Sequence, residues 1–309
     1  HHNNASAKMQ DFISLMRPIT LLQAVGAWIV GRLVVLRSTA TYTTIIQELL
    51  AILVVYLSYG FGMVANDCAD AALDATHPSS DGATTTSKKD RAIASGRISV
   101  GQGWLFAASL SMISLLISFT ALSHKFGLWC LSNLVIMLMY SLGLQKLFLM
   151  KNALVGWLCI SPLWGATSLI LQQGAHSFRS TLVLQTQMYA LAAAGFSLGV
   201  IREILKDIQD VDVDRGNKST LPLLVGVKTS ERISFLALGI TLGVLQTSYY
   251  RSLFAGRAGN FPIYSLGWCL ATGMCLRASL FPTIGRKQAW VKKSIYVLLV
   301  ALIASLLRG

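Results

Sequence analysis

The sequence predicts an all-α fold, a polytopic membrane helix bundle of about nine transmembrane helices around a central cavity. Of the 309 residues, 54% are hydrophobic and only 13% are charged, and the mean hydropathy is +0.59. Soluble domains carry nearly twice that share of charged residues. A helix needs about 20 apolar residues to cross a bilayer. The chain has nine apolar segments of about this length, near 19–37, 44–65, 103–122, 126–145, 153–172, 183–204, 233–250, 261–281 and 292–308.

Three polar segments complete a single predicted membrane domain over residues 1–309. The first is the N-terminal segment 1–16. The second is a long loop at 75–102, and the third is a shorter loop at 215–230. Each loop brings Lys and Arg residues close to a group of aspartates that precedes it.

The charges predict the topology. If the N-terminus is inside, nineteen of the 26 Lys and Arg residues fall on the inner side, as the positive-inside rule requires. Twelve of the 13 acidic residues fall there too, Glu48 being the exception. We therefore expect the N-terminus and the aspartates on the cytoplasmic side, or its equivalent in an organelle. The net charge of +13 lies in short loops between apolar segments, which favours a lipid bilayer rather than nucleic acid as the partner.

Two aspartate triplets with the same spacing lie 140 residues apart. The first aspartate motif contains Asp67, Asp70 and Asp74, and the second contains Asp207, Asp210 and Asp214. Steps of three and four residues would place each triplet on one helix face. Two like charges about 4 Å apart repel by roughly 4 kcal/mol at an effective dielectric near 20, so each triplet needs a cation. Oxygen ligands favour Mg²⁺ or Ca²⁺ over zinc, and Mg²⁺ commonly completes its shell with substrate phosphates.

Acids for a metal, nearby bases and an apolar interior together suit a lipid diphosphate. Metal ions and fixed cations stabilise the negative charge that develops on a diphosphate leaving group. An apolar interior would hold the lipid tail and exclude water from a reactive intermediate. An allylic prenyl diphosphate fits best, because its C–O bond can ionise to a stabilised carbocation. Phosphatidyl transferases also use membrane aspartates, so the acids alone do not decide between the two.

The motifs resemble those of a known family. Residues Asn66 to Asp74 match the N-D-x-x-D-x-x-x-D signature of the UbiA superfamily of intramembrane prenyltransferases, and Arg202 to Arg215 with Lys218 to Pro222 resemble its second motif. Further resemblance lies in Arg17-Pro18, in Arg91 to Ser99, in Tyr140-Ser141 with Leu144-Gln145-Lys146, and in Lys151-Asn152. The resemblance covers most of the chain in the right order, and nine helices is the fold it implies.

The resemblance also implies roles for individual residues. Tyr140 and Lys206 would be catalytic, with the Tyr140 ring near the reacting carbon, where it could stabilise cationic charge. Arg17 would lie on the acceptor side. The diphosphate would be bound by Arg91, Arg97, Lys146 and Lys206. The Mg²⁺ ligands would be Asn66, Asp67, Asp70, Asp74, Asp207, Asp210 and Asp214.

The sequence departs from the family pattern at three places. Ala92 replaces a usual proline, and Gln145 stands where a lysine or arginine is common. The stretch before Arg91, around 79–90, is about ten residues longer than usual for this group. These departures concern the loop and the acceptor pocket more than the metal ligands.

The function that we predict is Mg²⁺-dependent transfer of a prenyl group from an isoprenoid diphosphate to an aromatic or lipid-soluble acceptor within the membrane. One alternative is a terpene cyclase of the same fold, which would release diphosphate without an acceptor. A second is a non-catalytic subunit of a membrane complex, although the intact aspartates argue against it. A third is a transporter, but its signature would be a helix broken near the bilayer centre, whereas these acids lie at predicted helix ends.

Overall fold

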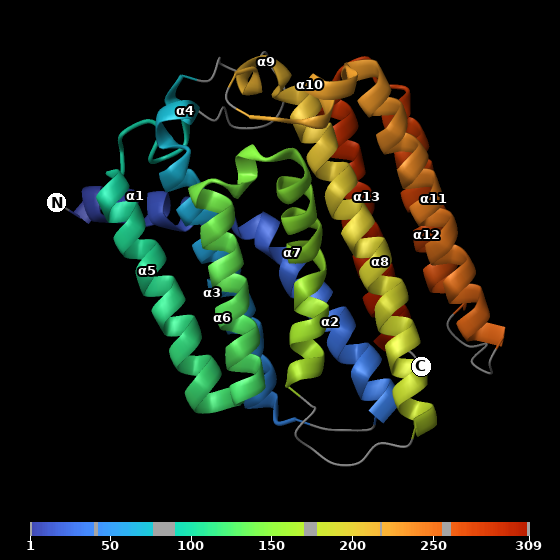
Figure 1. Ribbon diagram of the computed structural model, residues 1–309. Coiled ribbons are helices and arrows are strands. Elements are labelled where there is room, and N and C mark those ends of the chain that lie inside the picture. Colours follow the sequence, from blue (N-terminus) through green and yellow to red (C-terminus); the bar gives the residue numbers. More distant parts are fainter. Residues whose placement is uncertain are drawn as a thin grey trace. The chain divides into compact units, whose positions relative to one another are not determined.

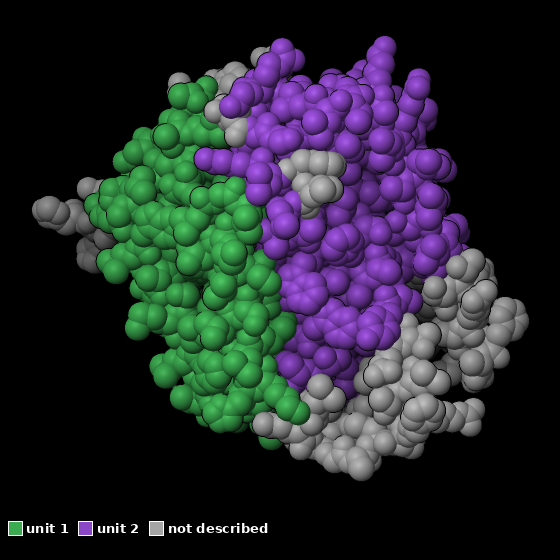
Figure 2. Space-filling model, viewed as in Figure 1, with its two compact units in different colours: residues 1–25, 43–145 green, residues 26–42, 146–309 purple. Residues whose placement is uncertain are grey.

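The computed structural model describes residues 2–39, 43–76, 90–169, 178–216, 218–254 and 261–307. Within these ranges every regular element is a helix, which confirms the all-α prediction. The chain forms two compact units, coloured separately in Figure 2. Unit 1 contains residues 1–25 and 43–145, and unit 2 contains residues 26–42 and 146–309. Helix α2 (Pro18–Thr39) contributes to both units.

Unit 1 is organised around helix α3 (Ile45–Ala69), which packs against both α5 (Val100–Ile117) and α6 (His124–Leu142) (Figure 1). Small residues permit this close packing. A Cβ added at Gly62 would lie 2.6 Å from Met137 Sδ on α6. A Cβ at Gly103 would lie 2.5 Å from Cys68 Sγ, beside the first aspartate motif. Such contacts hold helices together in lipid, where burial away from water contributes little.

Three helices of unit 1 begin directly after a residue whose side chain caps the helix N-terminus. Helix α3 begins after Thr44 and α5 after Ser99, and each of these residues forms a capping box with a glutamine three residues later. A π-helical turn (Ser118–Leu122) leads to Ser123, whose hydroxyl accepts the Phe126 N–H at the start of α6. Helix α1 (His2–Leu15) forms most of the segment predicted as polar and N-terminal, and α4 (Ala71–Ala75) and a 3₁₀ turn (Leu144–Lys146) complete the unit.

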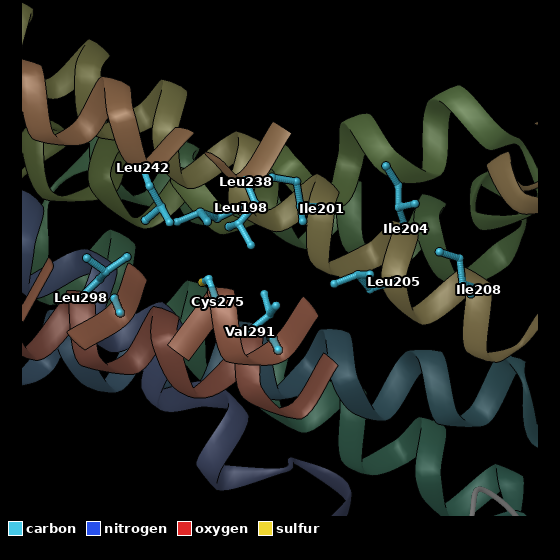
Figure 3. Close-up of a cluster of buried hydrophobic side chains, with 12 residues drawn as sticks. Leu198, Ile201, Ile204, Leu205, Ile208, Leu238, Leu242, Cys275, Val291 and Leu298 are labelled. Carbon is cyan, nitrogen blue, oxygen red and sulfur yellow. The ribbon is translucent and has the colours of Figure 1, made fainter. Parts of the chain in front are cut away.

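Unit 2 is organised around helix α8 (Phe178–Gln209), which packs against α7 (Phe148–Ser168), α11 (Val227–Phe254) and α13 (Ile284–Leu307). Helix α12 (Phe261–Ser279) packs along α13. Figure 3 shows how Leu205 of α8, Leu238 of α11 and Val291 of α13 belong to one buried apolar cluster. A second buried apolar cluster joins α2, α7 and α8 through Val30, Leu163 and Met188.

The predicted membrane segments agree with the helices. Each of the nine segments overlaps a long helix, although the number that cross the bilayer stays a prediction. Among the described residues, six stretches are long and apolar enough to cross, and they are Pro18–Leu36, Ile45–Ala69, Val100–Leu122, His124–Leu142, Met188–Gln209 and Ile284–Leu307. The central cavity also stays a prediction.

The two predicted loops need separate treatment. Residues 77–89 of the first loop, which include the long stretch at 79–90 apart from its last residue, lie outside the described residues. The second loop, at 215–230, is shorter than predicted, because it contains α10 (Leu221–Val225) and the first residues of α11. Pro222 sits in the first turn of α10, where its missing N–H costs nothing. Gly226, with φ of +85°, then allows the chain to turn into α11.

Candidate functional site

Both aspartate motifs contain the same break in a helix. Helix α3 ends at Ala69, and α4 begins at Ala71, with Asp70 between them at φ −92° and ψ 4°. In unit 2, α8 ends at Gln209 and α9 (Val211–Asp214) begins directly after Asp210, at φ −96° and ψ 7°. These dihedrals lie in the sparsely populated bridge region that is common at active sites. The Asp74 N–H still bonds to the Asp70 carbonyl at 2.8 Å, and the Asp214 N–H to the Asp210 carbonyl at 2.9 Å. The shared helix face of each motif therefore stays a prediction, although the regular helix is interrupted at the middle aspartate.

Two arginines neutralise the outer aspartates of the first motif. Asp67 is buried and pairs with Arg17, and its Oδ1 is also 3.1 Å from Arg91 Nη1. The same Arg91 nitrogen lies 2.6 Å from Asp74 Oδ2. Arg91 therefore bridges the first and third aspartates across the bend. This contact keeps both carboxylates on one side of the motif although they belong to different helices.

Arg17 adopts a backbone conformation that is rare for residues other than glycine. Its φ is +52°, between the end of α1 and Pro18 at the start of α2. A left-handed conformation costs a residue with a side chain about 1–2 kcal/mol. Burial lowers the pKa of the Arg17 guanidinium, and the Asp67 carboxylate opposes this effect. Arginine side chains in proteins keep their charge, so Asp67 faces a cation. A strained residue held by an ion pair with a buried carboxylate is a candidate functional residue.

Asp70 differs from its two neighbours, because its hydrogen bonds come from neutral amides. Asn66 Nδ2 donates to Asp70 Oδ2 at 3.2 Å, and Gln145 Nε2 donates to Asp70 Oδ1 at 2.9 Å. Gln145 is 3% exposed and also donates to the Ser141 carbonyl. These bonds orient the carboxylate of Asp70 without cancelling its charge. The glutamine that departs from the family pattern thus has a defined contact in the first motif.

A lysine at position 145 should weaken Mg²⁺ binding at this motif. In Gln145→Lys, an ammonium would lie beside Asp70 and repel a divalent cation. We expect the Mg²⁺ affinity, measured by calorimetry without prenyl diphosphate, to fall at least about tenfold, which corresponds to roughly 1.4 kcal/mol. The matched control Gln145→Leu loses the hydrogen bond but adds no charge, so it should lose much less affinity. Equal affinities in the wild type and the lysine variant would contradict this account of Asp70.

Arg91 and Arg97 share one loop but have different partners. Ala92 and Ile98 are buried and joined by a backbone hydrogen bond of 3.0 Å, with Gly96 at φ +78° between them. This turn presents Arg91 to the first motif. Arg97 instead donates to Asp11 Oδ1 at 3.0 Å and to the Asp90 carbonyl at 2.9 Å, and it is about half exposed. The described contacts therefore do not bring Arg97 to the first motif.

A buried lysine neutralises the second motif. Lys151, on α7, is 3% exposed and pairs with Asp207 and, at 3.2 Å, with Glu203 Oε1. Lys206 lies on α8 at 3.3 Å from the same Glu203 and is partly exposed. After the motif, Lys218 Nζ is 3.6 Å from Asp214 Oδ1. Lys151 and Glu203 are thus members of this site that we did not predict as site residues.

Three further predicted residues, Lys146, Tyr140 and Asp210, have defined positions in the fold. Lys146 has an exposed side chain, and its backbone carbonyl accepts the N–H of Ser219 at 3.0 Å, just beyond the second motif. Tyr140 lies in the last turns of α6 and is partly buried. Asp210 is buried at the bend of the second motif. The predicted roles of these residues stay predictions.

The donor atoms of both motifs fit Mg²⁺. Every predicted ligand is an Asp or Asn, so all donors are oxygens, as Mg²⁺ prefers. Asn66 Oδ1 and Asp207 Oδ2 are buried and have no hydrogen-bond partner among the described residues. A buried acceptor without a partner costs about 1–3 kcal/mol, so a cation at either atom would be stabilising. No three acidic, His or Cys side chains in the described ranges meet closely enough to hold a metal alone.

The fold is a bundle of long apolar helices, as in a multi-pass membrane protein, with an aspartate motif at a helix break in each of its two units. The model of the UbiA prenyltransferase family matches residues 25–306, and the chain belongs to this family. It is therefore a transmembrane prenyltransferase. This finding confirms the class of enzyme that the sequence predicts.

Similar proteins include several archaeal enzymes named digeranylgeranylglyceryl phosphate synthase. The protein from Thermococcus sibiricus is 26% identical over 98% of this chain and 99% of its own length. The protein from Methanoculleus marisnigri is 30% identical over 72% of this chain and 71% of its own length.

Solved structures show the same fold. A UbiA homologue from Aeropyrum pernix has a TM-score of 0.70 and 18% identity, covering 94% of this chain and 98% of its own. A UbiA homologue from Archaeoglobus fulgidus, solved with GPP and Mg²⁺ bound, has a TM-score of 0.66 and 17% identity. It covers 96% of this chain and 99% of its own.

Proposed function

We propose that this enzyme transfers a prenyl group from an isoprenoid diphosphate to a lipid-soluble acceptor, and that the transfer requires Mg²⁺. The observation that carries the proposal is the pair of aspartate motifs, each with a buried oxygen that has no hydrogen-bond partner among the described residues. Mg²⁺ at these oxygens would neutralise the diphosphate and stabilise it as a leaving group. The ligands would be Asn66, Asp67, Asp70, Asp74, Asp207, Asp210 and Asp214.

The basic residues would bind and orient the diphosphate. Arg91 is the strongest candidate, because it already contacts two motif carboxylates and offers a planar fork of donors that suits phosphate oxygens. Lys206 and Lys146 are exposed enough to reach an anion and would hold its outer oxygens. The ring of Tyr140 would stabilise the allylic cation. Apolar helix faces behind the motifs would exclude water until the acceptor attacks.

The acceptor that we propose is a lipid with a glyceryl phosphate headgroup. The names of the archaeal relatives specify geranylgeranyl groups on glyceryl phosphate, and this supports such an acceptor over an aromatic one. Arg17 would contact the acceptor phosphate, since its charge is retained and its side chain is a third exposed. By the same reasoning geranylgeranyl diphosphate is the first donor to test. The motifs would face the cytoplasm or its organelle equivalent.

The test is a product analysis with the purified chain in lipid nanodiscs. Prenyl diphosphates of different length are supplied with Mg²⁺, with and without a prenylated glyceryl phosphate or an aromatic acceptor, and both the diphosphate and the lipid products are quantified. We expect release that depends on the acceptor and yields one prenylated lipid per diphosphate. Release with a cyclised hydrocarbon product would establish a terpene cyclase instead. No release from a folded protein that binds Mg²⁺ would favour a non-catalytic subunit.

Arg91→Gln and Arg97→Gln should separate the two loop arginines. Arg91 touches the first motif, whereas Arg97 contacts Asp11 and a backbone carbonyl. Losing a cation that stabilises a leaving group reduces turnover by roughly 10²–10³-fold, so we expect a loss of this order in Arg91→Gln. The matched variant Arg97→Gln should lose less than about threefold, within the range of exposed ion pairs. Similar losses in the two variants would show that Arg97 also binds the diphosphate.

A further inference from the structure

Two cations lie on one indole ring at the turn between α12 and α13 in unit 2. The Arg277 guanidinium, in the last turn of α12, has its Cζ 4.8 Å from the centre of the Trp290 ring. Lys293 lies on α13 about one turn after Trp290, and its Nζ is 5.4 Å from the centre of the same ring. Phe281, in the turn, lies against this indole with its ring centre 5.7 Å away. We call Arg277, Trp290 and Lys293 the indole cluster.

Among the described residues, no carboxylate forms an ion pair with a cation of the indole cluster. The sequence has no Asp or Glu after Glu231, although nine Lys and Arg residues follow it. Glu231 itself pairs with the buried Lys287. Arg277, Arg286 and Lys293 are exposed, and none of them forms an ion pair with a described carboxylate. The Trp290 ring therefore holds two like charges close together, and no carboxylate in the described part of the chain balances them.

The position of the cluster places it at the edge of the bilayer. Helix α13, at Ile284–Leu307, is long and apolar enough to cross the membrane. Trp290 and Lys293 lie in its second and third turns, and Arg277 lies in the last turn of α12. Helices α12 and α13 pack side by side, so the turn between them forms the end of a helical hairpin (Figure 1). Tryptophan favours the headgroup region, because its ring is apolar and its N–H is polar. Phosphates of lipid headgroups occupy this same depth.

We propose that the indole cluster binds the headgroup phosphate of an anionic phospholipid from the surrounding bilayer. A guanidinium that rests on an aromatic face keeps its edge N–H groups available for a phosphate oxygen, and Lys293 adds a second charge. The bound lipid would balance the two charges and fasten the α12–α13 hairpin at the interface. This inference does not depend on the prenyl transfer reaction, since the cluster involves none of the residues of either aspartate motif.

Native mass spectrometry of the purified full chain tests the proposal. The protein in neutral detergent is titrated with phosphatidylglycerol or with phosphatidylcholine of the same acyl chains, at constant salt. The test variant is Arg277→Gln with Lys293→Gln. The matched control is Lys228→Gln with Arg232→Gln, which removes the same charge from exposed positions on α11 in the same unit. Thermal unfolding in detergent without added lipid verifies that both variants are folded.

We expect the wild type to prefer phosphatidylglycerol. Each cation near the headgroup contributes about fivefold in affinity, so the double test variant should bind phosphatidylglycerol at least about tenfold more weakly. The control should change by less than about twofold. Equal losses in both variants, or no loss in the test variant, would overturn the proposal. If the double variant fails to fold, Lys293→Gln alone carries the same test with an expected loss of about fivefold.

Discussion

Asp207→Asn should reduce prenyl transfer by roughly 10²–10³-fold while leaving the protein folded. Asp207 is 1% exposed, and one of its oxygens accepts from Lys151 while the other is buried without a partner among the described residues. An asparagine keeps the size and an acceptor for Lys151 but removes the negative charge that would bind Mg²⁺. Lys151 retains Glu203 as its counterion. The measurement is the rate of transfer at saturating Mg²⁺, together with the unfolding temperature.

The matched control for this prediction is Asp212→Asn. Asp212 lies five residues along the same segment, on the short helix α9, and its side chain is exposed. The same chemical change at this position should alter transfer by less than about twofold, as is usual for exposed surface sites. If Asp212→Asn and Asp207→Asn lost activity equally, the effect would come from the total negative charge of this segment. A specific role of Asp207 as a Mg²⁺ ligand would then be contradicted.

Lys151→Met should be the most destabilising of the substitutions considered. Lys151 is a buried cation between two buried carboxylates, Asp207 and Glu203. Methionine preserves the length of the side chain but leaves both acids without this counterion. Removing one partner of a buried ion pair costs about 3–5 kcal/mol, because an uncompensated charge stays in a medium of low dielectric. A fall in the thermal unfolding temperature, measured in detergent with the wild type in parallel, tests this expectation.

Two variants distinguish the buried ion pair from other causes. Lys206→Met removes a lysine that also contacts Glu203 but is 38% exposed, and it should cost less than about 1 kcal/mol. Adding Glu203→Gln to Lys151→Met removes one of the two uncompensated acids, so the double variant should recover part of the lost stability. A double variant that is less stable than Lys151→Met would contradict the electrostatic explanation.

The sequence predicted the helices well, because their causes are local. Apolar segments of membrane length overlap every long helix from α2 onward, whereas α1 lies in the segment that was predicted only as polar. The helix breaks at Asp70 and Asp210 were not predicted. A spacing of three and four residues is compatible with one straight helix, and no proline or glycine marks either position. Their bridge-region dihedrals are visible only in the structure.

The partners of the motif acids depend on contacts between distant segments, so the sequence indicated them only in part. The loop cation Arg91 was expected near the first motif, and it bridges Asp67 and Asp74. Gln145, noted as a departure from the family, hydrogen-bonds to Asp70 from 75 residues away. Lys151 appeared only as part of a family segment, since it looks like a charge at a helix start. Its burial against Asp207 requires α7 and α8 to pack, which one sequence does not reveal.

The most direct test of the central claim is the dependence of prenyl transfer on Mg²⁺. The purified enzyme is depleted of divalent cations with a chelator, supplied with geranylgeranyl diphosphate and a prenylated glyceryl phosphate, and assayed for the prenylated lipid as Mg²⁺ is added back. We predict no product without the metal, and one product lipid per diphosphate released once Mg²⁺ is restored. Product formation at an unchanged rate in the chelator would contradict a metal role for the two aspartate motifs.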